Sequence, residues 1–180
     1  SGHGYDGAFC GAVATVADGR FGSALLLPGG MFDAVEVSPG YGLDLGSNDF
    51  TLEAWVQPWY DMYRYGPQTI LGKSGGWDGY ALRIEDHRLV LRLDVNGQVV
   101  IAGTTSIPDG SWTHVAACRA GDRVQLFVNG VPEGSGWAVL PPWSSVSSAW
   151  APFRVGSTFN GDSFYGLVDE VRLSSTSRYM

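Results

Sequence analysis

The residues best suited to chemistry are aromatic rings gathered in one short segment. Residues 55–65 read WVQPWYDMYRY, and Pro58 with the polar residues around it prevents the segment from forming one buried strand. Sugars present apolar C–H faces that stack on Trp and Tyr, while neighbouring polar side chains bind their hydroxyls. The segment therefore suits saccharide binding, although such rings can also pack onto the protein's own sheet. The candidate ligand contacts are Trp59, Tyr60, Tyr63 and Tyr65.

Two further segments are rich in rings. Residues 75–80 contain Trp77 and Asp78, and residues 136–153 contain three tryptophans, of which Trp143 follows a pair of prolines. We add Trp77, Asp78 and Trp143 to the candidate ligand contacts. The alternative is that Pro-rich aromatic loops pack on each other to cover a sheet edge or face. A single ring usually has that packing role, but from the whole set we expect at least one ligand contact.

Composition limits the partners of the chain. Eleven Lys and Arg against 18 Asp and Glu give a formal charge of -7, which argues against nucleic acid and anionic lipid. No uncharged apolar run approaches the length that spans a bilayer, so we expect no membrane insertion. Cys10 and Cys118 are enough for one disulfide in an oxidising compartment, and two buried free thiols are the alternative. The three histidines show no zinc-ligand spacing.

The elements that must position these side chains are strands. Apolar residues alternate with period 2, as in residues 50–56, and Asn-Gly pairs at 96–97 and 129–130 predict two-residue hairpin turns. We predict an all-β fold, an antiparallel β-sandwich with a jelly roll of two curved sheets, and no helix. We expect one domain over residues 1–180, with residues 1–4 left over from expression. The expected strands are 24–27, 34–37, 50–56, 68–73, 80–85, 88–94, 99–103, 112–119, 124–128, 153–156 and 166–173.

An ordered set of motifs resembles a known family. The sequence is similar to laminin G-like (LamG-like) modules of the concanavalin A-like lectin/glucanase superfamily, from about residue 20 to the end. The resemblance implies a jelly roll that recognises glycans or proteins, and some members of the superfamily are glycoside hydrolases. The motifs are residues 22–29 followed by 33–35, 49–56, 107–116, 128–130 and 166–172.

The resemblance also implies a structural calcium ion. Its side-chain ligand would be Asp169, with a carbonyl from the turn around Gly22 and a further ligand near Asp6. Ca²⁺ takes six to eight oxygen ligands, which carbonyls of glycine-rich turns help to supply. The alternative is that Asp169 caps a turn or pairs with Arg172 or Arg154.

We expect no catalytic residues. Glucanases that the fold resembles place acidic residues at alternate positions of one strand, because a retaining pair must lie roughly 5 Å apart. Glu85-Asp86 and Asp169-Glu170 are adjacent, so their side chains point apart, and Glu53 is alone on its strand. A hydrolase would need carboxylates from different strands to converge. We assign Glu53, Trp55 and His114 to packing of the sheet surface.

The sequence therefore predicts a non-catalytic carbohydrate-binding module of a larger secreted or surface protein. Its expected partners are a polysaccharide or glycan and other domains of its parent protein, and we expect an extracellular monomer. The alternative is a protein-recognition or spacer domain of a surface adhesin, in which the aromatic loops form an interface.

Overall fold

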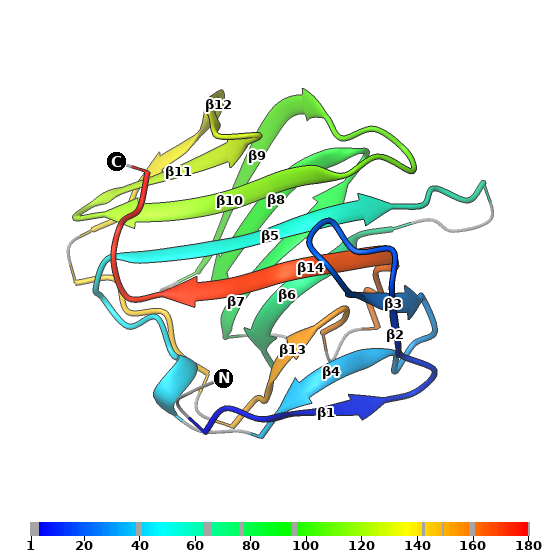
Figure 1. Ribbon diagram of the computed structural model, residues 1–180. Helices are drawn as coiled ribbons and strands as arrows, with labels where there is room; N and C mark the ends of the chain where they lie inside the picture. The colour runs from blue at the N-terminus through cyan, green and yellow to red at the C-terminus, as the bar shows by residue number, and fades with distance from the viewer. Residues whose placement is uncertain are drawn as a thin grey trace.

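The computed structural model describes residues 4–38, 41–62, 66–75, 78–94, 97–141, 143–148, 150–158 and 161–179. These residues form two seven-stranded antiparallel sheets and one short 3₁₀ helix, η1 (Tyr41–Leu43). Figure 1 looks onto one sheet, with strands β6 to β9 of the other behind it. The predicted all-β jelly-roll sandwich is confirmed.

The front sheet, here called the β5 sheet, has the order β12-β11-β10-β5-β14-β3-β2. Its strands are β12 (Val131–Val139), β11 (Arg123–Val128), β10 (Thr113–Ala120), β5 (Phe50–Pro58), β14 (Tyr165–Ser174), β3 (Ala24–Pro28) and β2 (Ala14–Val16).

The rear sheet, here called the β7 sheet, has the order β1-β4-β13-β6-β7-β8-β9. Its strands are β1 (Gly7–Cys10), β4 (Ala34–Val37), β13 (Phe153–Val155), β6 (Gln68–Ser74), β7 (Gly79–Glu85), β8 (Arg88–Asp94) and β9 (Gln98–Ser106).

One hydrophobic core lies between the sheets. Alternation along β5 turns Leu52, Ala54 and Val56 inward, and β8 turns Leu89 and Leu91 inward to meet them. The opposite residues of each strand, such as Glu53 and Trp55, lie on the outer faces.

Two turns show how local chemistry sets the register. Asn129 and Gly130, between β11 and β12, both have positive φ (51° and 77°), as the Asn-Gly pair predicts. Asp86 and His87, between β7 and β8, also have positive φ (46° and 63°), although neither is glycine. This second turn places the His87 ring against the Tyr60 ring.

The sequence pattern missed β1, β2 and β12. β1 is largely exposed, and β12 contains a proline and two glycines and lies opposite a register irregularity between Gln125 and Phe127. Such strands lack the apolar alternation that identifies the others.

The edge strands β9 and β12 belong to different sheets and are tied together by Glu133. Its carboxylate accepts hydrogen bonds from the backbone N–H groups of Thr104 and Thr105, at 2.6 and 2.9 Å, and from the Thr105 hydroxyl at 2.6 Å. Burial would raise the pKa of Glu133, but these hydrogen bonds together hold it below its ordinary value.

Of the two alternatives for the cysteines, a disulfide or two free thiols, the structure has the free thiols. Cys10 lies on β1 of one sheet and Cys118 on β10 of the other, and both thiols are free. Only Cys118 is fully buried, where its Sγ lies 3.2 Å from Thr51 Oγ1 and 3.1 Å from Ser177 Oγ. The segment after β14, here called the tail (residues 175–179), crosses β5 and β10 on the outer face (Figure 1).

Candidate functional site

The candidate site is built on the loop that leaves β5. The Trp59 N–H donates to the Tyr165 carbonyl at 2.8 Å, and the Tyr60 N–H donates to Asp109 Oδ1 at 2.9 Å. Gln68 bridges the same region, because its amide donates to the Trp59 carbonyl and accepts from the Tyr165 N–H. The start of the loop is therefore fixed by backbone hydrogen bonds.

The Tyr60 ring is fixed at both its end and its face. Its hydroxyl donates to the Ile107 carbonyl at 3.0 Å, and its ring meets the His87 ring at 4.0 Å between centroids, with an interplanar angle of 71°. Burial, and then the charge of Asp109, raise the pKa of Tyr60 well above its ordinary value, so the hydroxyl stays protonated at neutral pH.

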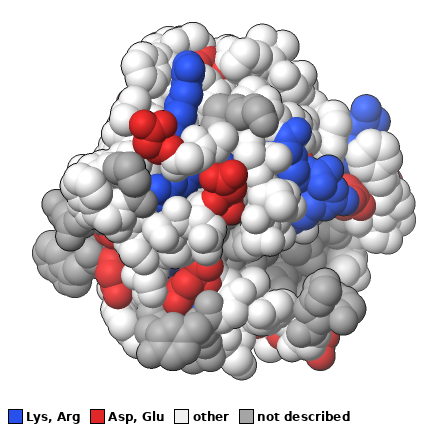
Figure 2. Space-filling model, turned by 90° about the vertical axis from the view of Figure 1, so that its left-hand side faces the viewer, with Lys and Arg blue, Asp and Glu red and all other residues white. Residues whose placement is uncertain are grey.

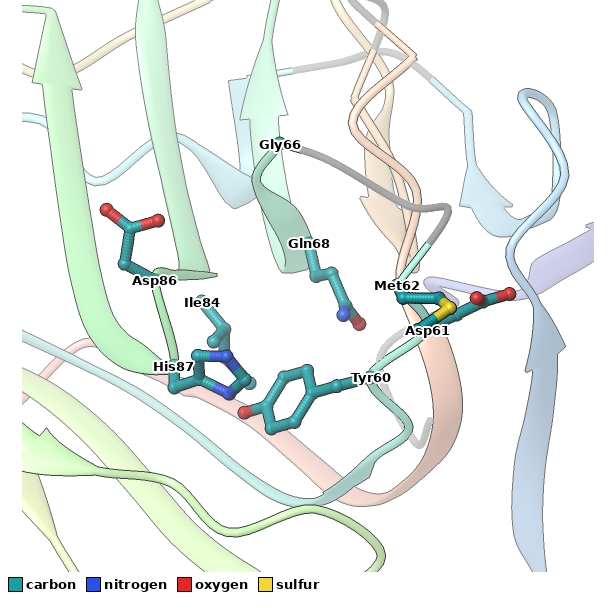
Figure 3. Close-up of a pocket in the computed structure, with 8 residues that line it drawn as sticks. All are labelled: Tyr60, Asp61, Met62, Gly66, Gln68, Ile84, Asp86 and His87. Atoms are coloured by element: carbon teal, nitrogen blue, oxygen red, sulfur yellow. The ribbon is translucent and has the colours of Figure 1, made fainter.

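A first hollow of about 410 Å³ lies on one side of the loop. Figure 3 shows the rings of Tyr60 and His87 side by side at its lower edge, with the Gln68 amide beside them. Asp61 and Met62 lie on the opposite side from Asp86. The lining residues are Tyr60, Asp61, Met62, Gly66, Gln68, Ile84, Asp86 and His87.

A second hollow of about 570 Å³ is lined by residues of the same loop. Trp59 and Tyr165 form an aromatic corner there, with ring centroids 5.2 Å apart and planes at 82°. Its lining residues are Trp59, Tyr60, Asp61, Met62, Asp109, Gly110 and Tyr165. The two hollows thus share one wall, Tyr60-Asp61-Met62.

The lining combines rings with hydrogen-bonding groups. Asp61, Asp86, Asp109 and the Gln68 amide can bind hydroxyl groups, while the rings offer apolar faces. No lysine or arginine is among the described residues that line either hollow. The arrangement suits recognition of a polar, ring-shaped ligand.

The predicted ligand contacts fall in two places. Trp59 and Tyr60 lie in the site, whereas Asp78 precedes β7 and accepts hydrogen bonds from Ser148 Oγ and Trp150 Nε1. The seven-residue β7 separates Asp78 from the His87 turn by about 23 Å of extended chain. Trp143 is 74% exposed and follows β12 in the same loop as Trp150. Tyr63, Tyr65 and Trp77 lie outside the described residues.

Sequence reasoning missed the residues that complete the site. His87, Gln68, Asp109 and Tyr165 come from four separate segments, and only strand register brings them to the loop. His87 could have been noticed because it lies in the two-residue turn between two expected strands. Nothing in the sequence around Asp109 or Tyr165 indicates a place in the site.

Asp169 lies beside the turn that contains Gly22, as the calcium hypothesis requires, but its carboxylate is engaged otherwise. Oδ2 accepts from the Phe21 N–H at 2.9 Å, and Oδ1 accepts from the Glu170 N–H at 2.7 Å. The Gly22 carbonyl accepts from the Gly19 N–H, and Asp6 precedes β1 of the other sheet.

Each carboxylate oxygen of Asp169 therefore accepts one backbone N–H group, as expected of a residue that caps a turn. Among the described residues, no group of three or more His, Cys, Asp or Glu could hold a metal ion. Asp169 caps the turn, Arg172 pairs with Glu53, and Arg154 pairs with Glu36. Calcium stays a prediction.

A third, smaller hollow of about 120 Å³ lies on the outer face of the β5 sheet, lined in part by Glu53, Trp55 and His114. The His114 ring packs against Trp55, with centroids 5.4 Å apart, and its Nε2 lies 3.5 Å from Glu53 Oε2. Burial lowers the pKa of His114, although Glu53 opposes the shift. Glu53 and His114 contact Tyr179 of the tail, whereas Trp55 packs against Phe21.

Charge is mixed over the visible surface. Figure 2 shows acidic and basic side chains near one another on one face, without a continuous field of either sign. In the described residues, no helix is long and apolar enough to cross a bilayer.

Comparison with known families and structures found clear matches. A laminin G family model, described as the concanavalin A-like lectin/glucanases superfamily, matches residues 29–179. A search of curated proteins found no match.

Among solved structures, the binding domain of Paraclostridial Mosquitocidal Protein 1 is similar, with a TM-score of 0.79 and 16% identity over 98% of this chain. Domain 4 of AbnA, a GH43 extracellular arabinanase from Geobacillus stearothermophilus solved with arabinotriose, has a TM-score of 0.68 and 23% identity. The alignment covers 93% of this chain and 77% of that one.

The binding domain of botulinum neurotoxin DC in complex with SialylT has a TM-score of 0.71 and 14% identity over 97% of this chain. The chain spans 45% of the mosquitocidal domain and 44% of the neurotoxin domain. At these identities the likeness shows a shared fold.

Proposed function

Because the chain belongs to the concanavalin A-like lectin/glucanases superfamily, we propose that it is a non-catalytic carbohydrate-binding module of a larger extracellular protein. The observation that carries the proposal is the pair of hollows that share the wall Tyr60-Asp61-Met62, in which Tyr60 is held by hydrogen bonds at its N–H and its hydroxyl. A site that is ordered before the ligand arrives spends less binding free energy on ordering.

The similar structures support the same class of function. One is a domain of an extracellular arabinanase in complex with arabinotriose, and others are binding domains of toxins. Each of these is part of a larger protein, which supports a parent protein for this chain. Extracellular location is proposed on the same basis.

Protein recognition is the second candidate function. It is favoured by Met62, which is 72% exposed in the shared wall and offers an adaptable apolar contact. A protein partner would bury Met62 itself, whereas a sugar would engage the rings and the carboxylates beside it.

A glycan array probed with the purified protein, with calcium and with EGTA, tests the proposal. We expect selective binding that Trp59→Ala weakens by about tenfold, because the ring lines the second hollow. Trp137→Ala is the matched control, since it removes a half-exposed ring outside both hollows. A blank array in both conditions would reject the carbohydrate function.

A further inference from the structure

The two hollows are related by their position around one loop. Beyond the shared wall, the first is lined by β6 and the β7–β8 turn, and the second by the segment before β10 and the start of β14. β6, β7 and β8 belong to the β7 sheet, whereas β10 and β14 belong to the β5 sheet, so the hollows lie toward different sheets and share the Tyr60-Asp61-Met62 wall. A ligand that fills both must cross that wall.

Each hollow is large enough to be a binding site alone. Their volumes, about 410 and 570 Å³, fall within the range of small-molecule sites, roughly 300–1,000 Å³. Each also has its own ring contact, the Tyr60–His87 pair in the first and the Trp59–Tyr165 pair in the second. The site therefore offers two places where a sugar ring can stack.

The charge of the lining restricts the ligand. Asp86 lines the first hollow, Asp109 lines the second, and Asp61 lines both. With no described cation in either lining and a formal charge of -7 on the chain, a carboxylated or sulfated sugar would be repelled. Carboxylates still accept hydrogen bonds from the hydroxyl groups of an uncharged sugar.

We propose that the two hollows are subsites for a single uncharged oligosaccharide chain, which crosses the Tyr60-Asp61-Met62 wall. This inference rests on the proposed carbohydrate-binding function and names its ligand class. Joining two sugar units in one chain makes the second contact intramolecular, so affinity rises once the chain is long enough to reach both hollows.

Isothermal titration calorimetry with oligosaccharides of one to six units tests the inference. The probes are neutral series derived from arabinan, cellulose and chitin, with trigalacturonate as the anionic comparison. For at least one neutral series we expect one chain per protein and an affinity gain of about 100-fold between the shortest and longest members. Trigalacturonate should bind more weakly than the neutral trisaccharide of that series.

Variants assign each hollow its part. Asp86→Asn alters the first hollow, and Asn tolerates the positive φ at this position. Asp109→Asn alters the second hollow, and the Asn side-chain oxygen can still accept the hydrogen bond from the Tyr60 N–H. Each should weaken the longest chain by about tenfold. The double variant should bind trigalacturonate more tightly than the original protein. Asp122→Asn, in the β10–β11 turn, is the matched control, and thermal unfolding verifies that every variant is folded.

The outcomes separate this inference from the proposed function. If neither a neutral series nor trigalacturonate binds, both fail. If a neutral sugar binds but its affinity does not depend on chain length, the carbohydrate function stands and the two hollows are not subsites of one chain. The same holds if two short sugars bind and a longer chain binds no more tightly. Preference for trigalacturonate rejects the uncharged ligand class alone.

Discussion

Glu53 is a buried carboxylate on the outer face of the β5 sheet, and its partners reach it from separate segments. The Tyr179 hydroxyl donates to Oε2, and Arg178 Nε lies 3.1 Å from Oε1. An uncompensated charge in this position would be costly, so the tail that supplies these partners is held down by them. Glu53, which the sequence assigned to packing of the sheet surface, is thus paired with Tyr179 and Arg178 of the tail.

Tyr179→Phe tests this anchor. We expect the free energy of unfolding to fall by about 1–3 kcal/mol, because Glu53 loses a charge-assisted hydrogen bond while the ring can still pack on Phe127. Urea unfolding at neutral pH provides the measurement. An unchanged midpoint would show that the tail contributes nothing through this contact.

The same residue predicts an alkaline pH dependence. Burial first, and then Glu53, raise the pKa of Tyr179 from 10.0 to about 12. Its folded pKa lies above the unfolded value, so the stabilisation is complete below pH 10 and is lost as pH rises toward 12. Thermal midpoints should fall over this window in the original protein and fall less in Tyr179→Phe.

Asp169→Ala tests the cap on the Gly19–Gly22 turn. Because the N–H groups of Phe21 and Glu170 lose their acceptor, we expect a loss of about 1–3 kcal/mol that is the same with and without EGTA. Thermal unfolding in both buffers gives the comparison. If EGTA destabilises the original protein but not the variant, calcium binds at Asp169 after all.

At the scale of elements, sequence predicted the strands that alternate and missed those that do not. β5, β7 and β8 have apolar faces that the core requires, so their patterns were readable. β12 has glycines and an exposed surface because it is an edge strand, and its place depends on Glu133. For the site, residue type indicated Trp59 and Tyr60, but the pairing that adds His87 and Tyr165 is non-local and leaves no pattern in the sequence.

Glu133→Ala should loosen β9 from β12. Removing a nearly buried carboxylate that accepts from Thr104 and Thr105 should cost about 2–3 kcal/mol. Amide hydrogen exchange at these two threonines should accelerate more than exchange in β5. Asp18→Ala, which removes an exposed carboxylate, is the control and should change neither quantity.

Acid should weaken the same contact. The folded pKa of Glu133 lies below its ordinary value of 4.5, so its stabilisation is present above that pH and is lost as pH falls through the folded pKa. The difference in stability between the original protein and Glu133→Ala should therefore shrink below about pH 4.

At the scale of the whole molecule, one core joins both sheets, which favours the single domain predicted from sequence. Leu91 is fully buried in that core, so Leu91→Ala should destabilise the protein by about 2–5 kcal/mol. Tryptophan fluorescence and circular dichroism should report one coincident transition for both proteins. Two separated transitions would instead show independently folding parts.

The buried thiol of Cys118 gives the molecule a reporter of its own motion. Its Sγ lies against Ser177 of the tail, so an alkylating reagent reaches it only when the tail has left β10. In a Cys10→Ser background, the rate at which Cys118 is alkylated therefore measures how often the tail detaches. A neighbouring domain docked on the tail would lower that rate.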